Sequence, residues 1–347
     1  MIRTIEQRKA TWRDFYVADG KRKFICRVVP PDDAPARPLP YPELKEQRID
    51  WAWDQYQRMA ARVEWLPDDT IPFLNPYTGT EIFAAAFGCE VSRPNDDMPF
   101  ALPMVTTAAE ADKLKVPDLD CEPMAILFEI ADELRRRAGD DALLALPDIQ
   151  SPMDITALVW DKNYLFCAMV DEAKAVHALA AKAMELLAKF LDEWFRRYGR
   201  EFIAHYPSYY MPWGLTLSED EIGSVSPEMF QEFFLPTLVA LSERYDGIGI
   251  HCCADSRHQW DGFRKIPKLR LMNLGGTRTA DEIREAYELF SPDTAHWHYA
   301  WNPGEPLWEH LAEYPPGTRA VLNFGPPNRE KAIEAAEKMA AAREKVE

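Results

Sequence analysis

The chain has 347 residues, a formal net charge of -17 and 47% hydrophobic residues, which is enough to bury a large core in one big domain or two ordinary ones. The acidic balance excludes nucleic acid and an anionic membrane surface as main partners, because both need a basic field, and it weighs against a highly anionic substrate. The start of the chain has no secretory segment and no apolar run approaches membrane-spanning length, so we expect a soluble protein.

The cysteine pattern indicates the compartment in which the protein works. They are scattered along a long chain rather than set out as a dense disulfide framework, which favours a reducing cytoplasm. The six are Cys26, Cys89, Cys121, Cys167, Cys252 and Cys253.

The first part of the chain differs in composition from the rest. A proline-rich arm over residues 30–42 precedes an aromatic helix over residues 51–65. There is no internal repeat and no flexible linker long enough to separate domains. We therefore predict that residues 1–64 form an N-terminal extension packed on a domain that spans residues 65–347.

Past residue 120, amphipathic helices alternate with short apolar strands, which is the pattern of βα units. The clearest helix covers residues 171–197, with apolar residues along one stripe and Gly199 where a C-cap belongs. The predicted strands cover residues 142–146, 201–205, 247–251, 269–273, 295–299 and 319–323. The other predicted helices cover residues 279–290, 306–313 and 328–345. Six strands with crossover helices predict an α/β fold, a (β/α)8 TIM barrel, whose remaining strands come from the first third of the chain.

Several of these strands end in polar or aromatic side chains. In a parallel barrel the carboxyl ends of the strands form one face, so residues far apart in sequence converge there. We predict that one cavity on this face is lined by Asp148, His205, His251, Cys253 and His298.

The run over residues 248–253 ends in an imidazole and two thiols. His251 and Cys253 are two positions apart, so both project from the same side of an extended strand and both can reach one ion. Nitrogen and sulfur ligands together suit zinc. The alternative is a pair of buried cysteines beside a hydrogen-bonded core histidine.

Three segments that occur in this order resemble the uroporphyrinogen decarboxylase superfamily. They are Leu-Ser-Glu-Asp-Glu at 217–221, a Ser-Pro-Glu helix start that leads to a proline over 225–236, and the His-Cys-Cys strand end at 251–253. The resemblance covers roughly residues 70–345 and implies the barrel fold.

The resemblance implies one of two chemistries. The decarboxylases use no metal and hold an anionic tetrapyrrole with an N-terminal arginine segment that this chain lacks. The corrinoid-linked methyltransferases hold zinc with a His-x-Cys and a distant cysteine. This chain has His251 and Cys253 but no later cysteine, so a third ligand is expected from His298, His296 or the acidic turn at Glu219 and Asp220.

We therefore favour a zinc-assisted methyltransferase that moves a methyl group between a corrinoid and a small methylated or methoxylated substrate or thiol. A metal-free decarboxylase of a porphyrinogen and a non-catalytic binding member are the alternatives. The expected partners are the small methyl donor or acceptor, a corrinoid protein and a second copy of the chain in a homodimer, in the cytoplasm and without nucleic acid or membrane. The predicted metal ligands are His251, Cys253 and His298; the predicted catalytic residues are Asp148, His205 and Asp220; and the predicted cofactor-binding residues are Tyr210, Trp297 and Tyr299.

Overall fold

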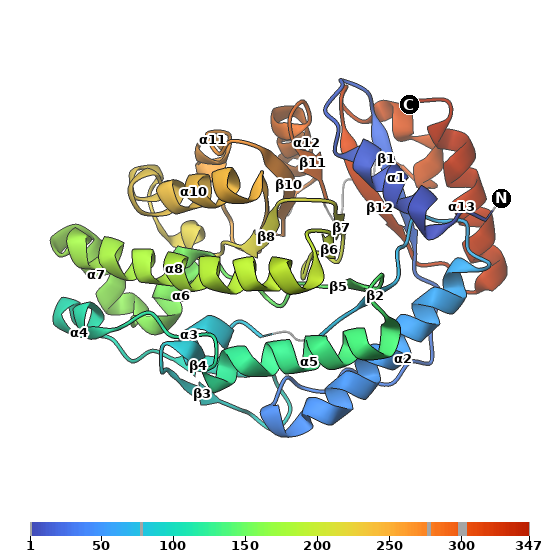
Figure 1. Ribbon diagram of the computed structural model, residues 1–347. Helices are drawn as coiled ribbons and strands as arrows, with labels where there is room; N and C mark the ends of the chain where they lie inside the picture. The colour runs from blue at the N-terminus through green and yellow to red at the C-terminus, as the bar shows by residue number, and fades with distance from the viewer. Residues whose placement is uncertain (1, 77–78, 276–278, 298–303, 347) are drawn as a thin grey trace.

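The computed structural model describes residues 2–76, 79–275, 279–297 and 304–346. Its largest sheet is parallel and follows the order β1-β12-β11-β10-β9-β8 (Figure 1). The strands of this sheet are β1 (Lys23–Val28), β8 (Leu215–Ser218), β9 (Ile248–Cys252), β10 (Leu269–Leu274), β11 (Ala295–His296) and β12 (Arg319–Phe324).

Shorter strands continue the curvature on the other side of the barrel. They are β2 (Phe73–Leu74), β5 (Leu143–Leu144) and β6 (Phe202–Ile203). β2 pairs with β5 in parallel, the amide of Leu146 donates to the carbonyl of Ile203 at 2.9 Å, and the amide of Ser218 donates to Ile149 at 2.8 Å. These contacts connect β5 with β6 and with β8, so the strands follow a barrel whose ladder is continuous only along the six-stranded sheet.

Two small antiparallel pairs occur beside the parallel strands, and β6 takes part in both kinds of pairing. They are β3 (Glu90–Ser92) with β4 (Phe100–Leu102), and β6 with β7 (Tyr210–Met211).

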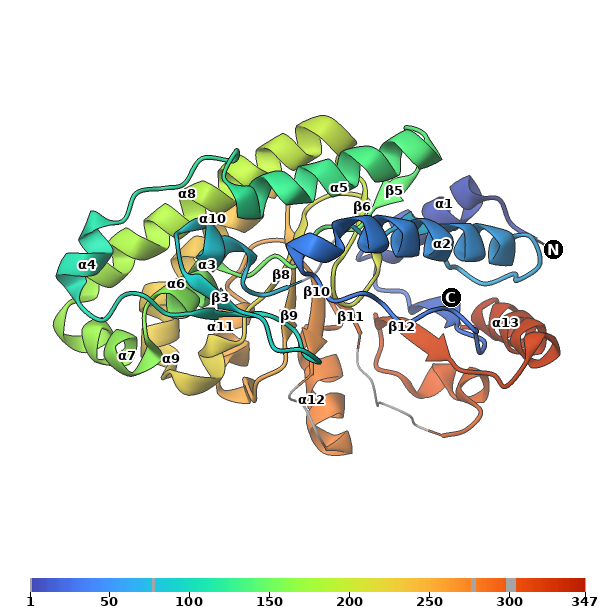
Figure 2. The same cartoon turned by 90° about the horizontal axis from the view of Figure 1, so that it is seen from below.

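Helices cover the outside of the strands (Figures 1 and 2). α5 and α8 lie side by side, with the rings of Phe128 and Phe190 5.3 Å apart. The α-helices are α1 (Ile5–Phe15), α2 (Lys45–Val63), α3 (Ile82–Ala86), α4 (Ala108–Lys113), α5 (Glu122–Ala138), α6 (Pro152–Val159), α7 (Lys162–Asp171), α8 (Ala173–Tyr198), α9 (Pro227–Met229), α10 (Leu235–Tyr245), α11 (Trp260–Phe263), α12 (Ala280–Phe290) and α13 (Arg329–Arg343). Single turns of 3-10 helix are η1 (Pro42–Leu44), η2 (Glu221–Ser224), η4 (Arg257–Gln259), η5 (Leu307–Glu309) and η6 (Leu311–Glu313), and η3 (Phe230–Phe234) is a π-helix.

Local sequence explains where the main helices begin and end. α8 buries one stripe of apolar side chains and stops at Gly199, whose φ of 89° is open to glycine but strained for other residues. α6 begins at Ser151, whose hydroxyl accepts from the amide of Asp154, with Pro152 at the first helical position. α12 begins with a capping box in which Thr279 and Glu282 satisfy each other's amides.

Residues 1–64 supply a strand of the sheet as well as helices packed on it. β1 pairs with β12 over six residues, from Lys23 opposite Arg319 to Val28 opposite Phe324. α1 packs beside β1, and the indole of Trp12 donates to the carbonyl of Asp69 at 2.8 Å. The boundary at residue 64 was predicted from a change in composition. In the structure, the sheet includes β1 from the N-terminal side of that boundary, because the apolar residues of β1 pack against α13 and the barrel interior.

A buried group of charges ties this N-terminal part to the end of the chain. We name Arg3, Arg8, Asp68, Asp69 and Arg343 the N-terminal ion cluster. Arg8 meets Asp68 at 2.7 Å, and Arg3 and Arg343 each meet Asp69 at 2.7 Å. Each buried carboxylate therefore faces at least one guanidinium.

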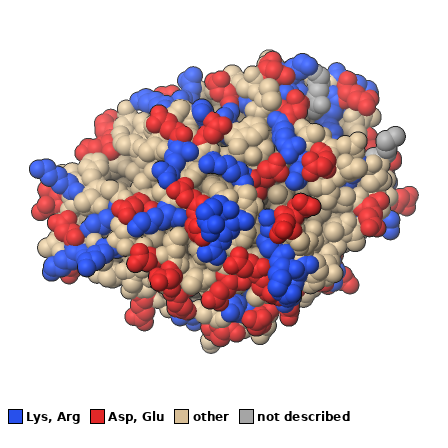
Figure 3. All heavy atoms as spheres, in the orientation of Figure 1, with Lys and Arg blue, Asp and Glu red and all other residues tan. Residues whose placement is uncertain are grey.

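The predicted alternation of strands and helices is confirmed by the elements of the second half, with three differences. β7 and β8 were not among the predicted strands. Residues 306–313 form the turns η5 and η6 rather than one α-helix. The helical stretch near residue 171 breaks at Glu172 into α7 and α8. No helix in the described part of the chain is long and apolar enough to cross a membrane. On the face in Figure 3, basic and acidic side chains are interspersed.

Candidate metal centre

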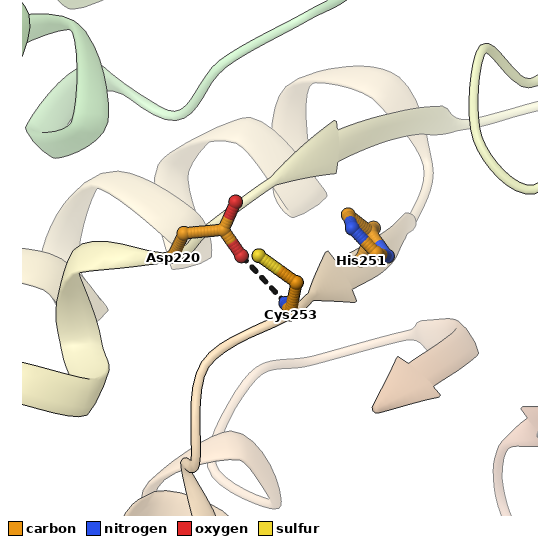
Figure 4. A group of neighbouring side chains, drawn as sticks. All are labelled: Asp220, His251 and Cys253. Carbon is orange, nitrogen blue, oxygen red and sulfur yellow. Dashed lines mark hydrogen bonds between the residues drawn. The ribbon is translucent and has the colours of Figure 1, made fainter. Parts of the chain in front are cut away.

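Three side chains with metal-binding atoms converge at the ends of β8 and β9 (Figure 4). They are Asp220, His251 and Cys253, whose ligand atoms all lie within 4.8 Å of one another. The parallel pairing of β8 with β9 sets this arrangement, because Ser218 lies opposite His251 and the amide of Glu219 donates to the carbonyl of His251 at 2.9 Å. The group therefore lies at the carboxyl end of the strands.

Backbone contacts hold the acidic turn against the strand end. The amide of Cys253 donates to Asp220 Oδ1 at 2.6 Å, and the carboxylate of Asp220 and the sulfur of Cys253 point toward one another (Figure 4). The alternation of β9 puts Cys252 on the other side, where its buried sulfur lies 3.7 Å from the carbonyl of Ala254. His251 and Cys253 thus share a side, and Cys253 is exposed.

A hydrogen bond from β10 orients the imidazole of His251. Its Nδ1 pairs with Oδ1 of Asn273, while Nδ2 of Asn273 donates to the carbonyl of Trp297 at 2.9 Å. Because the amide nitrogen of Asn273 is committed to Trp297, its oxygen faces His251 and must accept. Nδ1 of His251 therefore carries the proton, and Nε2 keeps a lone pair for a ligand.

The surroundings of these three residues are acidic. Both oxygens of Asp154 accept backbone amides of the turn, from Asp220 at 2.8 Å and from Glu221 at 3.1 Å. Burial raises the pKa of Asp154 to about 7, and the nearby charge of Asp220 adds to this. Burial and then the charge of Asp154 raise the pKa of Glu219 well above its usual value. We name Asp154, Glu219 and Asp220 the acidic turn cluster.

The thiol of Cys253 responds to the same environment. Partial burial of the sulfur, and then the carboxylate of Asp220, raise its pKa to about 12. Among the described residues, no lysine or arginine forms an ion pair with Asp154, Glu219 or Asp220. A thiolate would thus need another positive charge, which suits the donor set of a divalent cation.

Asp148 and His205 form a second polar pair beside the first group. Nε2 of His205 lies 3.5 Å from Asp148 Oδ2, and Gln150 donates to Asp148 Oδ1 at 2.8 Å. Burial lowers the pKa of His205, against the opposing effect of Asp148. The ring of Tyr206, the next residue, lies edge-on to His251 at 4.6 Å, so the two groups are neighbours on one face.

The predicted aromatic residues do not all lie on this face. Trp297 lies 5.6 Å from Tyr206 and belongs to this face. Tyr210 instead packs under α1, 6.5 Å from Trp12, and the ammonium of Lys9 lies 6.0 Å from its ring. His298 and Tyr299 lie outside the described residues.

The alternative third ligands named above differ in whether they lie near His251 and Cys253. His296 is buried on the outer side of β11, stacked on Tyr287 at 4.4 Å and 3.3 Å from the hydroxyl of Ser291. Of the acidic turn, Asp220 reaches His251 and Cys253, whereas the side chain of Glu219 is fully buried.

Sequence reasoning did not assign three residues that shape this face, Asn273, Asp154 and Glu81. Asn273 was visible as a polar residue ending a strand, but Asp154 has the pattern of an ordinary first-turn acid after Ser151-Pro152. Glu81 is buried beside the start of α3, and burial followed by the charge of Asp148 raises its pKa to about 7. The signal for both carboxylates is burial, which a single sequence does not display.

Comparison with known proteins completes this description. The chain has the fold of a methyltransferase from Methanosarcina mazei, with a TM-score of 0.61 and 12% identity over 99% of this chain and 98% of that one. No curated protein matches its sequence. The sequence profile of the uroporphyrinogen decarboxylase family, whose domain is a TIM barrel, matches residues 77–288, more than half of the chain. The chain is therefore a member of the uroporphyrinogen decarboxylase (URO-D) family and has its barrel fold.

Proposed function

We propose that this protein is a methyltransferase that holds zinc with Asp220, His251 and Cys253. In this proposal it moves a methyl group between a small methylated or methoxylated substrate, or a thiol, and a corrinoid carried by a partner protein. The observation that carries the proposal is the convergence of the three ligand atoms within 4.8 Å at the end of the strands.

The donor set fits zinc better than the other common cations. One sulfur, one imidazole nitrogen and one carboxylate oxygen suit zinc, whereas calcium and magnesium prefer oxygen alone. Three protein ligands leave a fourth position open, as in catalytic zinc sites. In place of the distant cysteine of the methyltransferase branch, Asp220 supplies the third ligand. When bound there, zinc would act as a Lewis acid on a thiol or an ether oxygen.

The neighbouring residues have separate tasks in this proposal. Asn273 keeps the proton on Nδ1 of His251, so that Nε2 remains a ligand. His205 is held neutral by its lowered pKa and can take up a proton from the substrate, and Asp148 stabilises the imidazolium that results. Trp297 and Tyr206 form an aromatic wall beside His251.

The shared fold and the name of the structural neighbour support the methyltransferase part of the proposal. We also infer a corrinoid partner, a homodimer and a cytoplasmic location from the family resemblance and from the scattered cysteines. The URO-D family also includes decarboxylases, so the test must separate the two activities.

The first test measures zinc in protein purified without a chelator or a histidine tag. We expect about one equivalent in the wild type and in Cys167→Ser, which changes an exposed cysteine far along the chain from the strand end. Cys253→Ser should lose tightly bound zinc. The assignment is wrong if Cys253→Ser keeps a full equivalent, or if the wild type takes up none when zinc is supplied.

The second test measures activity. Methyl transfer should require a reduced corrinoid or corrinoid protein and should stop when zinc is removed. Release of carbon dioxide from uroporphyrinogen by the metal-free protein would instead establish a decarboxylase.

A further inference from the structure

A groove of about 610 Å³ lies between α12 and the segment of η4 and α11 that follows β9. Charged side chains make up most of its lining. Four of the lining residues are acidic, whereas one is an arginine and none is a lysine; they are Asp255, Asp261, Glu282 and Glu285, with Arg257. The lining is therefore negatively charged, and its field favours a cationic occupant.

The arginine of this groove is held weakly. Arg257 of η4 forms an ion pair with Glu285 of α12, and the two side chains are 55% and 48% exposed. An exposed pair of this kind adds little stability, because water and salt screen it. Asp255 and Asp261 form no ion pair with any described residue. A cation from outside can therefore replace Arg257 at Glu285 and leave the displaced guanidinium in solvent.

Trp260 gives the same groove a hydrogen-bond donor without a partner. The side chain lines the groove, is 4% exposed and lies edge-on to Phe290, with the ring centres 6.0 Å apart. Its indole Nε1 has no acceptor among the described residues. A buried donor that lacks an acceptor costs about 1–3 kcal/mol. A ligand that brings a carbonyl oxygen to the indole and a cation to the carboxylates would satisfy both.

The turn η4 contacts both the groove and the neighbourhood of the candidate metal centre. It follows Cys253 along the chain and holds the segment around η2 by side-chain hydrogen bonds. Gln259 donates through Nε2 to the carbonyls of Ile222 at 3.1 Å and Val225 at 2.8 Å. Nε2 of His258 donates to the carbonyl of Val225 at 3.0 Å. A ligand in the groove therefore binds beside the metal centre without using any of its proposed ligands.

We propose that this groove binds a basic peptide segment of a partner protein. A lysine or arginine side chain of the segment lies at Glu285 and Asp261, and one of its backbone carbonyls accepts from Nε1 of Trp260. A simple diamine supplies the charge but has no acceptor for the indole. The formal net charge of -17 attracts such a segment from solution. The site is independent of the proposed function, since none of its residues is a proposed metal ligand or catalytic group.

The test titrates three probes into the full-length protein by calorimetry. They are a tetrapeptide with two central lysines and blocked ends, the same peptide with norleucine in place of lysine, and 1,5-diaminopentane, which has the charge of the first peptide. We expect the lysine peptide to bind at least about tenfold more tightly than the norleucine peptide, because its ammonium groups form charge-assisted hydrogen bonds. It should also bind more tightly than the diamine, and its affinity should fall as the salt concentration rises.

Four variants assign the binding to the groove. The double change Glu285→Gln and Asp261→Asn should abolish the preference for lysine. Arg257→Gln should instead strengthen binding of the lysine peptide by up to about fivefold, because it removes the competing cation from Glu285. Trp260→Phe keeps an aromatic ring and should weaken the peptide by about two- to tenfold through loss of the donor. Glu288→Gln, the matched control, changes an exposed acid of α12 outside the groove and should keep full affinity.

Two results would overturn the proposal. Equal affinity for the lysine and norleucine peptides, or a lysine preference that survives Glu285→Gln with Asp261→Asn, refutes the groove as the site. A diamine that binds as tightly as the lysine peptide, together with unchanged binding in Trp260→Phe, refutes the peptide as the occupant. Zinc-loaded and metal-free proteins are titrated in parallel, so a failure of the metal centre leaves this test intact.

Discussion

The N-terminal ion cluster and the acidic turn cluster both bury carboxylates, but only the first is compensated. In the N-terminal ion cluster, Asp68 and Asp69 face guanidiniums at 2.7 Å. In the acidic turn cluster, Asp154, Glu219 and Asp220 lie together without an ion pair among the described residues, and the pKa values of Asp154 and Glu219 are raised. The difference teaches how to separate charges that support the fold from charges that await a ligand.

The physical reason is the cost of burying a charge. A paired carboxylate repays part of this cost through its partner, and removing the partner exposes the full penalty. An unpaired carboxylate lowers its cost by taking up a proton or by binding a cation. Substitution in the first cluster should therefore affect stability, and substitution around the second should affect metal binding.

The largest expected effect is the loss of folding stability in Arg8→Met. This change leaves Asp68 buried without its partner and removes hydrogen bonds to the carbonyls of Leu66 at 2.6 Å and Thr70 at 2.9 Å. We expect a loss of about 3–5 kcal/mol in the free energy of unfolding, measured by chemical denaturation. Zinc content should stay at the wild-type level. A loss below about 1 kcal/mol, or a loss of zinc in folded protein, would contradict the distinction.

The next effect is stabilisation by zinc. At free zinc about 1,000 times the dissociation constant, the wild type should gain about 4 kcal/mol over chelator-treated protein, because only the folded chain assembles the site. Arg8→Met should gain the same increment from its lower baseline, since its defect lies in the other cluster. Cys253→Ser should gain none. An equal gain in Cys253→Ser would place the zinc elsewhere.

Glu81, another buried carboxyl, is expected to change the free energy of unfolding with pH by at most about 3 kcal/mol. Its pKa rises from an ordinary 4.5 to about 7, so between these values the folded chain holds a proton that the unfolded chain has released. Stability therefore falls as pH rises through this window. Glu81→Gln should remove this contribution, so that the variant gains stability relative to the wild type as the pH increases from 4.5 to 7. Parallel denaturation curves for the two proteins across that range would contradict the assignment.

The smallest effect concerns the orientation of His251. Asn273→Ala removes the acceptor that fixes its proton on Nδ1 and should weaken zinc binding by about 10- to 100-fold, as outer hydrogen bonds do at metal sites. Asn273→Asp retains an acceptor and should recover most of the affinity in competition with a metal-binding dye. Equal zinc affinity in the wild type and Asn273→Ala would show that the imidazole is oriented by its packing alone.

The sequence predicted best those features that depend on a single strand. His251 and Cys253 share a side because alternation along a strand depends only on local geometry, and the six predicted strands all contain observed strand residues. β1 was missed because basic residues precede it and a proline-rich arm follows it. β2, β5 and β6 have only two strand residues each, too few to show a period, although apolar runs revealed the last two.

The sequence could not predict which residues are brought together by the pairing of separate strands. The acidic turn was one of three alternatives for the third ligand, and the β8–β9 register brings Asp220 to His251 and Cys253. Likewise, Tyr210 was chosen for the pocket, whereas its neighbour Tyr209 contacts Arg27 and Trp297. Such choices depend on how separate segments meet, which composition and periodicity do not specify.

The pairing of β1 with β12 also has a consequence for how the protein is made. These strands come from opposite ends of the chain, so the first strand to be synthesised waits with an unpaired edge until nearly the whole chain has appeared. Closing so long a loop adds an entropic cost that grows slowly with length, while contacts distant in sequence slow folding. We therefore expect β8, β9 and β10, which pair in sequence order, to assemble early. The six-stranded sheet that carries His251 then becomes complete only when β12 joins β1, so this edge of the sheet is among the last parts of the protein to form.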